Sequence, residues 1–259
     1  MPRSTTDLAN TPSREFIADR LGQFYDIAVD ELTFLGGEVD RNYRLRAAGG
    51  STYLVKVQTA VGDRTDLQWQ EAILVHLRDK ELGFAVPNIV PTVGGDLHVP
   101  FELGPDGGLL RVLDWISGTE LGRVDEHSPS LLRELGAAAA TTTAALKGFS
   151  APSLHATHHW DLTRSGEIIR DSIADDSVRA DDFGARSALA AFDAIAPELN
   201  DLPRALVHHD LNDNNVLVAE SDGRQTIAGS STSTTRSTAF ASPSRRSQAR
   251  TRCSARTTR

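Results

Sequence analysis

The stretch "LVHHDLNDNNVLV", residues 206–218, places two histidines, two aspartates and three asparagines between two short aliphatic runs. The aliphatic runs extend into segments typical of strands, which we predict at residues 205–209 and 215–221. Buried strands do not usually enclose such a polar cluster unless the cluster has a function. Other parts of the chain would then have to supply partners for these polar side chains.

Asp210 and Asn215 have four residues between them, and His208 lies two residues before Asp210. The same spacing, His-x-Asp-x-x-x-x-Asn, occurs in the catalytic loop of phosphotransferases. In such loops the aspartate reaches the hydroxyl group that attacks, and the asparagine turns back to hold a metal ion on the nucleotide phosphates. A polar hairpin without any catalytic function is an alternative for this motif taken alone.

Three features upstream would suit a nucleotide site, and they occur in the order that such a site requires. Lys56 lies in the predicted strand "TYLVKV", and Glu71 follows in a predicted helix, where it could pair with Lys56. Gly36 and Gly37 join two predicted strands and would let the backbone approach a phosphate group. Each feature alone is weak, because strand lysines are usually exposed edge charges and Gly-Gly hairpins are common. Their combination with the loop at Asp210 favours nucleotide binding.

The formal net charge of −8 conceals an uneven distribution along the chain. Residues 230–259 contain seven arginines and no acidic residue, so residues 1–229 carry 20 basic and 35 acidic side chains, a balance of −15. An acidic body argues against nucleic acid as the main partner and weakly favours a cationic small molecule, but a solvated acidic surface is the better explanation of this composition.

The sequence contains no apolar run of the roughly 20 residues that a membrane span requires. The N-terminal residues lack an apolar segment of the secretory kind. The single cysteine, Cys253, cannot form an internal disulfide, which suits a reducing compartment. These features predict a cytoplasmic protein without a membrane partner.

The order of predicted elements indicates an α+β chain in two lobes. We predict strands at 31–35, 42–47, 52–57, 88–93, 97–103, 109–116, 205–209, 215–221 and 224–229. We predict helices from about 12 to 25, from Thr65 to near Gly83, from Ser128 to about 148, and over 180–196. The expected parts are a flexible N-terminus (1–13), a nucleotide-binding lobe (14–113), a partial second lobe with the catalytic loop (114–229) and a disordered tail (230–259).

Three histidines at 155, 158 and 159 invite a metal site, but cysteine and carboxylate ligands at suitable spacing are not evident nearby. Trp160 and Asp161 follow directly, and could hold a cationic acceptor through the ring face and the carboxylate. A buried tryptophan with a capping aspartate is an equally good interpretation of this pair.

Four segments, "FLGGEVDRNYRL", "YLVKV", "RVLDWISGTEL" and "HHDLNDNNVLV", together with Glu71, resemble the aminoglycoside phosphotransferase and choline kinase-like family. The likeness covers residues 14–229 and is greatest for the hydroxylysine kinase-like branch. It implies a protein kinase-like fold with an antiparallel N-terminal sheet, one long helix and a mainly helical second lobe. It also implies Mg²⁺-dependent transfer of the γ-phosphoryl group of ATP to a hydroxyl group of a small molecule.

The resemblance assigns roles by position. Lys56 would contact the α- and β-phosphates, Glu71 would hold Lys56, Asp210 would be the catalytic base and Asn215 a metal ligand. The segment that links the lobes would offer backbone groups to adenine from Asp114, Trp115 and Ile116. Trp160 and Asp161 would lie near the acceptor.

The pattern breaks after residue 229, where such kinases carry a second metal-binding aspartate in an Asp-Phe-Gly-like turn. Of the 30 residues in 230–259, 15 are Ser or Thr, and none is Asp, Glu, Leu, Ile or Val. Such a composition predicts disorder. With GC-rich codons, one added base before codon 230 would turn "SSTSTT" into Ile-Val-Asp-Phe-Asp-Asp, which is the expected turn. We therefore expect that a frameshift truncated this chain, and that its activity is impaired. A catalytically dead nucleotide-binding or interaction protein with a genuine basic tail is the alternative.

Overall fold

The computed structural model describes residues 12–37, 40–58, 65–102, 107–150, 162–174, 184–199, 204–208, 210–230 and 238–240. Contacts between Cα atoms divide the chain into two compact units, each described by itself below. Unit 1 comprises Met1–Thr141, Gly148–Leu154 and Asp210–Thr234. Unit 2 comprises Thr142–Lys147, His155–His209 and Thr235–Arg259. The predicted lobe boundary at residues 113 and 114 stays an expectation.

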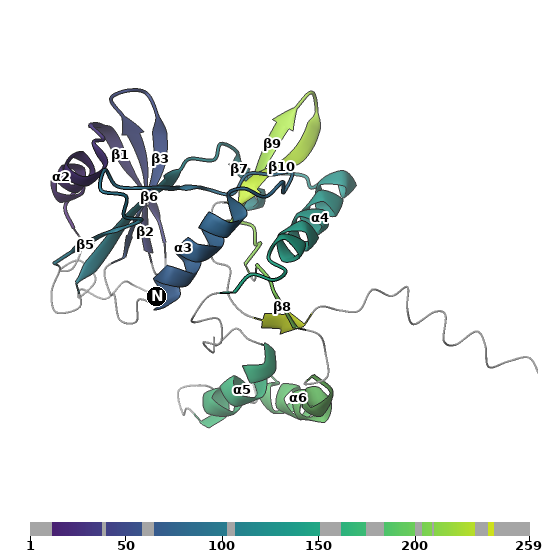
Figure 1. Ribbon diagram of the computed structural model, residues 1–259. Coiled ribbons are helices and arrows are strands. Elements are labelled where there is room, and N and C mark those ends of the chain that lie inside the picture. The colour runs from purple at the N-terminus through teal and green to yellow at the C-terminus, as the bar shows by residue number, and fades with distance from the viewer. Residues whose placement is uncertain are drawn as a thin grey trace, which may run out of the picture. The chain divides into compact units, whose positions relative to one another are not determined.

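The main sheet of unit 1 is antiparallel, with the strand order β1-β2-β3-β6-β4 and β5 paired to β6 (Figure 1). Its strands are β1 (Val29–Gly36), β2 (Asp40–Ala47), β3 (Thr52–Gln58), β4 (Ile89–Val90), β5 (Val99–Phe101) and β6 (Gly108–Asp114). Glycines at 36–37 and 49–50 end β1 and β2, as the turn chemistry predicts. The predicted hairpins are therefore confirmed, although the strands expected at 88–93 and 97–103 are much shorter.

Helix α2 (Arg14–Tyr25) covers one face of this sheet. Its cap is Ser13, whose Oγ accepts a hydrogen bond from the Phe16 backbone N–H at 3.1 Å. The helix thus begins slightly later than the predicted start at Pro12, because the serine satisfies a free N–H of the first turn. The helix ends at Asp26, which adopts a left-handed conformation with φ 55°.

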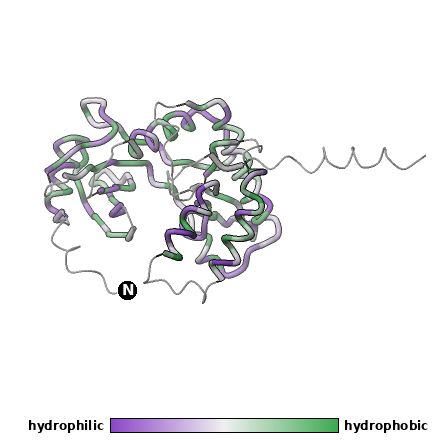
Figure 2. Tube along the Cα trace, turned by 90° about the horizontal axis from the view of Figure 1, so that it is seen from below, coloured by the Kyte–Doolittle hydropathy of each residue, from purple (hydrophilic) through white to green (hydrophobic). Residues whose placement is uncertain are grey.

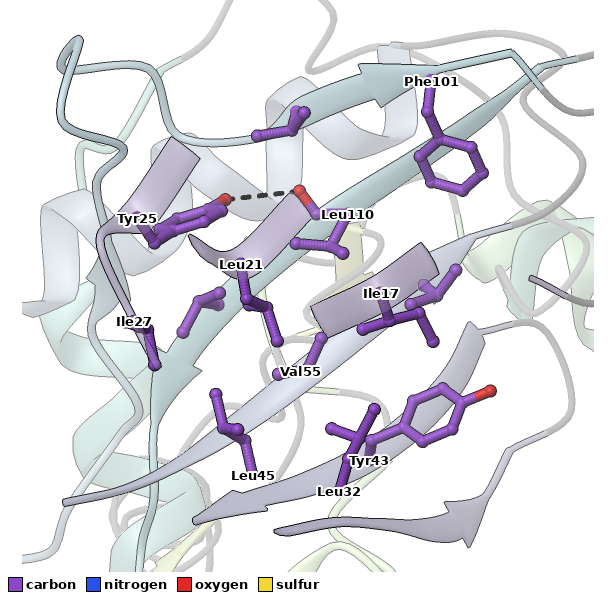
Figure 3. Close-up of a cluster of buried hydrophobic side chains, with 13 residues drawn as sticks. Ile17, Leu21, Tyr25, Ile27, Leu32, Tyr43, Leu45, Val55, Phe101 and Leu110 are labelled. Atoms are coloured by element: carbon purple, nitrogen blue, oxygen red, sulfur yellow. Dashed lines mark hydrogen bonds between the residues drawn. The ribbon is translucent and has the colours of Figure 1, made fainter. Parts of the chain in front are cut away.

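The core under α2 comes from alternate positions of the strands (Figure 3). Residues of α2 spaced by four positions meet side chains of the sheet that are almost completely buried. The Tyr25 hydroxyl also donates a hydrogen bond to the Leu110 carbonyl oxygen at 3.4 Å. The buried members of this cluster are Ile17, Leu21, Tyr25, Ile27, Leu32, Tyr43, Leu45, Val55, Val57, Val99, Phe101, Leu110 and Val112.

Helix α3 (Thr65–Leu77) packs against the opposite face of the sheet. Leu74 of the helix joins Leu54 and Leu113 in a buried cluster, with Ile89 and Trp115 packed against it. The helix ends at Leu77, six residues before the glycine at which we expected it to stop. Successive strand residues point to opposite faces of the sheet. The strand residues that alternate with those packed on α2 therefore face α3.

A second sheet in unit 1, with the order β10-β9-β7, contains β9, the strand that follows the polar loop at Asp210. Its strands are β7 (Thr119–Glu120), β9 (Val216–Ser221) and β10 (Arg224–Ser230). The 3-10 helix η1 (Leu121–Arg123) and α4 (Pro129–Ala145), most of which belongs to this unit, supply Leu121 and Leu131, which pack on Val216 and Val218. Glu134 of α4 accepts hydrogen bonds from Arg224 Nη2 and the Ile227 backbone N–H.

Unit 2 contains η2 (Leu162–Arg164), α5 (Ser165–Ala174), α6 (Ala185–Leu199), β8 (Arg204–Leu206) and β11 (Thr238–Phe240). Helices α5 and α6 pack together and are joined by an ion pair between Arg170 and Asp193. β11 lies within the stretch that we expected to be disordered, and it pairs antiparallel with β8. Helix α6 was predicted, whereas α5 was not.

Hydrophilic and hydrophobic stretches alternate along the chain (Figure 2). Among the described residues, no helix is both long enough and apolar enough to cross a membrane.

Candidate active site

A row of polar side chains crosses three neighbouring strands on the face that α3 covers. Asn42 of β2 is the register partner of Lys56 of β3, and Lys56 is the partner of Arg111 of β6. Residues directly opposite each other in antiparallel strands lie on the same face. Lys56 and Arg111 are buried, with 7% and 2% of their surface exposed. The sheet therefore presents two buried cations side by side beneath α3.

Asp40, the first residue of β2, is the anion that faces both cations. Its Oδ2 lies 3.3 Å from Lys56 Nζ and 3.3 Å from Arg111 Nη2. Arg111 Nη2 also donates to Gln70 Oε1 of α3 at 3.1 Å. Burial lowers the pKa of Lys56, and Arg111 lowers it further, whereas Asp40 counteracts both. One carboxylate thus stabilises the charged form of a fully enclosed lysine.

Glu71 has a different partner from the one that we predicted. Its Oε1 accepts a hydrogen bond from His98 Nδ1 at 2.8 Å, and both side chains are largely shielded from solvent. Within the described residues, no ion pair joins Glu71 to Lys56. In this structure Asp40 rather than Glu71 neutralises Lys56.

Two buried polar atoms near Lys56 lack hydrogen-bond partners among the described residues. They are Arg111 Nη1 and Asn42 Oδ1, which flank Lys56 in the same row. An unpaired buried donor on a guanidinium group costs free energy unless another group accepts its hydrogen bond. A phosphate oxygen is one group with the right charge and chemistry.

The glycine loop leads from β1 into Asp40. Gly36 and Gly37 have φ values of 109° and 132°, which L side chains rarely adopt. A Cβ atom on Gly37 would lie only 1.8 Å from the Asp40 carbonyl oxygen, so the loop closes against the backbone of Asp40. The loop and the ion pairs of Lys56 are therefore connected through a single residue.

The predicted linker begins at the end of β6. Asp114 is tied down, because its backbone N–H donates to the Asn88 carbonyl at 2.9 Å and its Oδ2 accepts from Asn88 Nδ2 at 2.9 Å. The Trp115 ring lies 5.1 Å from the Arg44 guanidinium carbon. Side-chain atoms of Ile116 lie close to Gly229, where an added Cβ would be 2.8 Å away.

The loop between β8 and β9 holds the Asp210 side chain from two sides. Asn212 Nδ2 donates to Asp210 Oδ1 at 2.6 Å, and Asn215 Nδ2 donates to Asp210 Oδ2 at 2.6 Å. Asn215 Nδ2 also lies 2.9 Å from the Asp210 carbonyl oxygen. The half-buried carboxylate is thereby oriented without losing access to solvent. The predicted pair of Asp210 and Asn215 is brought together by this loop.

Backbone contacts make the same loop rigid. Asn212 Oδ1 accepts hydrogen bonds from the backbone N–H groups of Asn214 and Asn215, an Asx-type turn. The Gly122 N–H donates to the Asp213 carbonyl oxygen at 2.9 Å, and a Cβ on Gly122 would lie 2.9 Å from the Asp213 Cβ. Close approach of this glycine therefore anchors the loop to η1.

The end of β10 is fixed by Ala85, which forms an isolated parallel bridge with Gly229. The Ala85 N–H donates to the Ala228 carbonyl at 2.9 Å, and the Ser230 N–H donates to the Ala85 carbonyl at 3.0 Å. The strand β10 is thus held in place up to Ser230.

Three residues of the candidate site were not predicted from the sequence, namely Asp40, Arg111 and His98. The alternation of β2 and β6 could have placed Asp40 and Arg111 on the face of Lys56, but only with the strand register known. His98 carried no local signal. Trp160, Asp161 and the three histidines before them lie outside the described residues. In the described part, no group of three or more His, Cys, Asp or Glu residues could hold a metal ion.

Several solved kinases have a similar fold. Amicoumacin kinase, solved with AMP-PNP and Ca²⁺, is 16% identical, with a TM-score of 0.60 over 86% of this chain and 65% of that chain. Aminoglycoside 2'-phosphotransferase-IIIa, solved with GDP, is 17% identical, with a TM-score of 0.60 over 90% and 75%. A microcompartment-associated aminopropanol kinase is 19% identical, with a TM-score of 0.55 over 82% and 66%. The chain thus spans about two thirds of the length of two of these kinases.

These likenesses confirm the predicted α+β, kinase-like fold, with its antiparallel N-terminal sheet and its later helices. No curated protein matches the sequence. The model of the phosphotransferase enzyme family (APH), however, matches residues 31–227, which include the glycine loop, Lys56, Glu71, Asp210 and Asn215. The chain therefore belongs to the phosphotransferase enzyme family.

Proposed function

We propose that the chain derives from an ATP-dependent kinase that transfers the γ-phosphoryl group to a hydroxyl group of a small, amine-bearing molecule. The observation that carries this proposal is the Asp210 carboxylate, oriented by amide groups of Asn212 and Asn215 at 2.6 Å each. An oriented, half-buried carboxylate next to a metal-competent amide is what a phosphotransferase needs in order to activate a hydroxyl group.

Asp210 would act as the base. The acceptor oxygen forms a bond to the γ-phosphorus while the bond to the β–γ bridging oxygen breaks, and ADP leaves with that electron pair. The hydroxyl proton passes to Asp210, which the Asn212 and Asn215 amides hold toward the acceptor. Rigid positioning of this kind supplies much of the catalysis, because phosphoryl transfer asks for little covalent chemistry from the protein.

Lys56 and Arg111 would receive the nucleotide phosphates. Among the described residues the two cations share one ion-pair partner, Asp40, and Arg111 Nη1 has no hydrogen-bond partner. The loop at Gly36 and Gly37 lacks side chains that would keep phosphate groups from its backbone.

Adenine would bind to backbone groups of the linker. The Asp114 N–H already donates to the Asn88 carbonyl, which leaves Trp115 and Ile116 as the positions that would contact the base. Of the predicted linker residues, Asp114 would then serve to fix the linker rather than to bind nucleotide.

Mg²⁺ would be held by Asn215 and by the phosphates themselves. Mg²⁺ is commonly bound through one or two protein oxygens together with substrate phosphates, so Asn215 Oδ1 suits it. Residues 230–259 contain no aspartate or glutamate for a second contact. Loss of one metal ligand leaves charge on the transferring group poorly neutralised, and we therefore propose that turnover by this chain is severely reduced.

The acceptor would carry an amine. The balance of −15 in residues 1–229 and the predicted pair Trp160 and Asp161 favour a cation. One structural neighbour is an aminopropanol kinase and another an aminoglycoside phosphotransferase. Resemblance to the hydroxylysine kinase-like branch adds amino alcohols of that type to the candidate acceptors. The acidic composition fits a cytoplasmic, soluble enzyme.

A catalytically dead nucleotide-binding protein is the second candidate, and the absence of acidic residues in 230–259 favours it. The two candidate functions predict different gene sequences around codon 230. If a frameshift produced the tail, sequencing across codons 225–235 will reveal an open frame that continues through Ile-Val-Asp-Phe-Asp-Asp. If the gene encodes residues 230–259 in frame and no open reading frame continues in the shifted frame, the second candidate is favoured.

The activity test is ADP formation from Mg-ATP in the presence of amino-alcohol and aminoglycoside acceptors, with Asp210→Asn as the control. We expect slow, acceptor-dependent ADP formation that Asp210→Asn abolishes. Ordinary kinase turnover, about 1–100 per second, would contradict the impairment. Nucleotide binding without any transfer would favour the second candidate.

A further inference from the structure

Two acidic side chains, Asp40 and Glu71, have partners beneath α3 that the sequence did not predict. Asp40 Oδ2 lies 3.3 Å from Lys56 Nζ, whereas Glu71 Oε1 lies 2.8 Å from His98 Nδ1. Glu71 was expected to hold Lys56, but its carboxylate is engaged by the histidine. The carboxylate that pairs with Lys56 therefore comes from β2.

We propose that Asp40 is the residue that positions Lys56 for the nucleotide phosphates, with Arg111 holding the Asp40 carboxylate in place. The inference rests on the proposed function in so far as Lys56 binds nucleotide. Asp40 acts through Lys56 and is a positioning residue, whereas Glu71 serves to bind His98 and to join α3 to the segment before β5.

The geometry favours Asp40 because both its side chain and its backbone are held by neighbouring residues. Arg111 Nη2 donates to its Oδ2, and the same Arg111 nitrogen is oriented by Gln70 Oε1 of α3. Its backbone carbonyl oxygen lies against Gly37. Asp40 thus contacts the glycine loop through its backbone and Lys56 through its side chain.

The charges lead to the same conclusion. Lys56 pairs with Asp40 of β2 and has Arg111 of β6 as its register partner, while Gln70 of α3 accepts a hydrogen bond from Arg111. Glu71 of the same helix pairs with His98. Burial and Arg111 both lower the pKa of Lys56, and Asp40 opposes them. Removal of the Asp40 charge would leave Lys56 and Arg111 without an ion-pair partner among the described residues, and Lys56 would lose its proton more readily.

Competitive labelling of lysines with an amine-reactive reagent, read by mass spectrometry as a function of pH, tests the proposal directly. The chain contains only three lysines, and Lys80 and Lys147 are exposed internal standards beside buried Lys56. The reagent reacts with the neutral amine, so the midpoint of the labelling curve reports the protonation of Lys56.

We expect Asp40→Asn to lower the Lys56 midpoint by about one pH unit or more, and Asp40→Glu to restore it. Glu71→Gln, the matched control, should change it by less than about half a unit. Arg111→Gln should raise it, because Arg111 lowers the pKa of Lys56. Loosened structure alone cannot produce the lowered midpoint of Asp40→Asn, because exposure of Lys56 would raise its pKa and with it the midpoint.

A midpoint that falls in Glu71→Gln and not in Asp40→Asn would overturn the proposal and assign Lys56 to Glu71. An unchanged or raised midpoint in Asp40→Asn would also overturn it. Protection of Lys56 from the reagent by Mg-ATP is measured separately. If the wild-type chain shows no protection, nucleotide binding at Lys56 fails, while the midpoints still decide the role of Asp40.

Discussion

The side-chain amide of Asn215 donates a hydrogen bond to the Asp210 carboxylate, with 2.6 Å between Nδ2 and Oδ2. The two residues are separated by four others, and the Asx-type turn at Asn212 folds the chain back so that they meet. In this arrangement Asn215 orients the carboxylate through its nitrogen and can present its oxygen to a metal ion. One side chain would thus serve both the base and the metal.

Asp210→Asn should abolish phosphoryl transfer without weakening nucleotide binding. The amide cannot accept the hydroxyl proton, and loss of general base catalysis typically costs about 10²–10⁴ in rate. The comparison is best made by ADP formation in the presence of an acceptor and by calorimetric titration of Mg-ATP. Equal rates for the variant and the wild type would remove Asp210 from the mechanism.

Asn215→Ala and Asn215→Asp should differ in their response to Mg²⁺. Alanine removes both the metal-competent oxygen and the hydrogen bonds to Asp210, so nucleotide affinity should lose its dependence on Mg²⁺ concentration. Aspartate keeps an oxygen ligand and adds charge, so the dependence should persist. Identical Mg²⁺ titrations for the two variants would argue against metal binding at this residue.

Thr232→Asp introduces an aspartate at the position where the altered reading frame would place the metal-binding turn. A second carboxylate should strengthen the binding of Mg-ATP relative to ATP alone, since the metal gains an oxygen ligand. Thr238→Asp, six residues further on, adds the same charge and is the control. An equal gain in both variants would show a general charge effect rather than a metal ligand.

Leu21→Ala should lower the free energy of unfolding by about 2–5 kcal/mol, because the side chain is fully buried between α2 and the sheet. Leu35→Ala is the matched control, since Leu35 is 50% exposed, and it should cost less than about 0.5 kcal/mol. Urea titrations of the two variants measure the difference. Similar losses for both would contradict the packing of α2 on this sheet.

The depressed pKa of Lys56 should contribute to the pH dependence of stability. Between its folded and unfolded pKa values Lys56 is neutral in the folded chain and charged in the unfolded one. The unfolded state then binds more protons, and stability rises with pH over this window below 10.5. Lys56→Met should remove that rise, which urea titrations between neutral pH and pH 10 would reveal as a pH-dependent difference from wild type.

The sequence contained the information for the sheet and for the loop that joins Asp210 to Asn215, because both depend on local patterns. Glycine pairs marked the turns around β2, and the four-residue spacing between Asp210 and Asn215 identified the loop. The partner of Lys56 could not be predicted in the same way. Asp40 and Glu71 are both acidic and lie at similar distances from Lys56 along the sequence. Only the strand register and the position of His98 show which of them pairs with Lys56.

Helix α5 was missed for a related reason. The helix is only ten residues long, and the histidine-rich segment before it gave no capping pattern that would mark its start. The short strands β7 and β11 have only two and three residues, too few for any alternation to be visible. Their pairing with β9 and β8 depends on tertiary contacts rather than on local sequence.

Binding of Mg-ATP to the wild-type chain and to Lys56→Met, measured by isothermal titration calorimetry, tests the central claim most directly. We predict saturable binding by the wild type that weakens about tenfold or more in the variant, as expected for loss of a charge-assisted hydrogen bond of at least about 1.5 kcal/mol. Lys80→Met, at an exposed position, should bind like the wild type. Absence of binding by the folded wild-type chain, or equal binding by Lys56→Met, would contradict a nucleotide site built on Lys56.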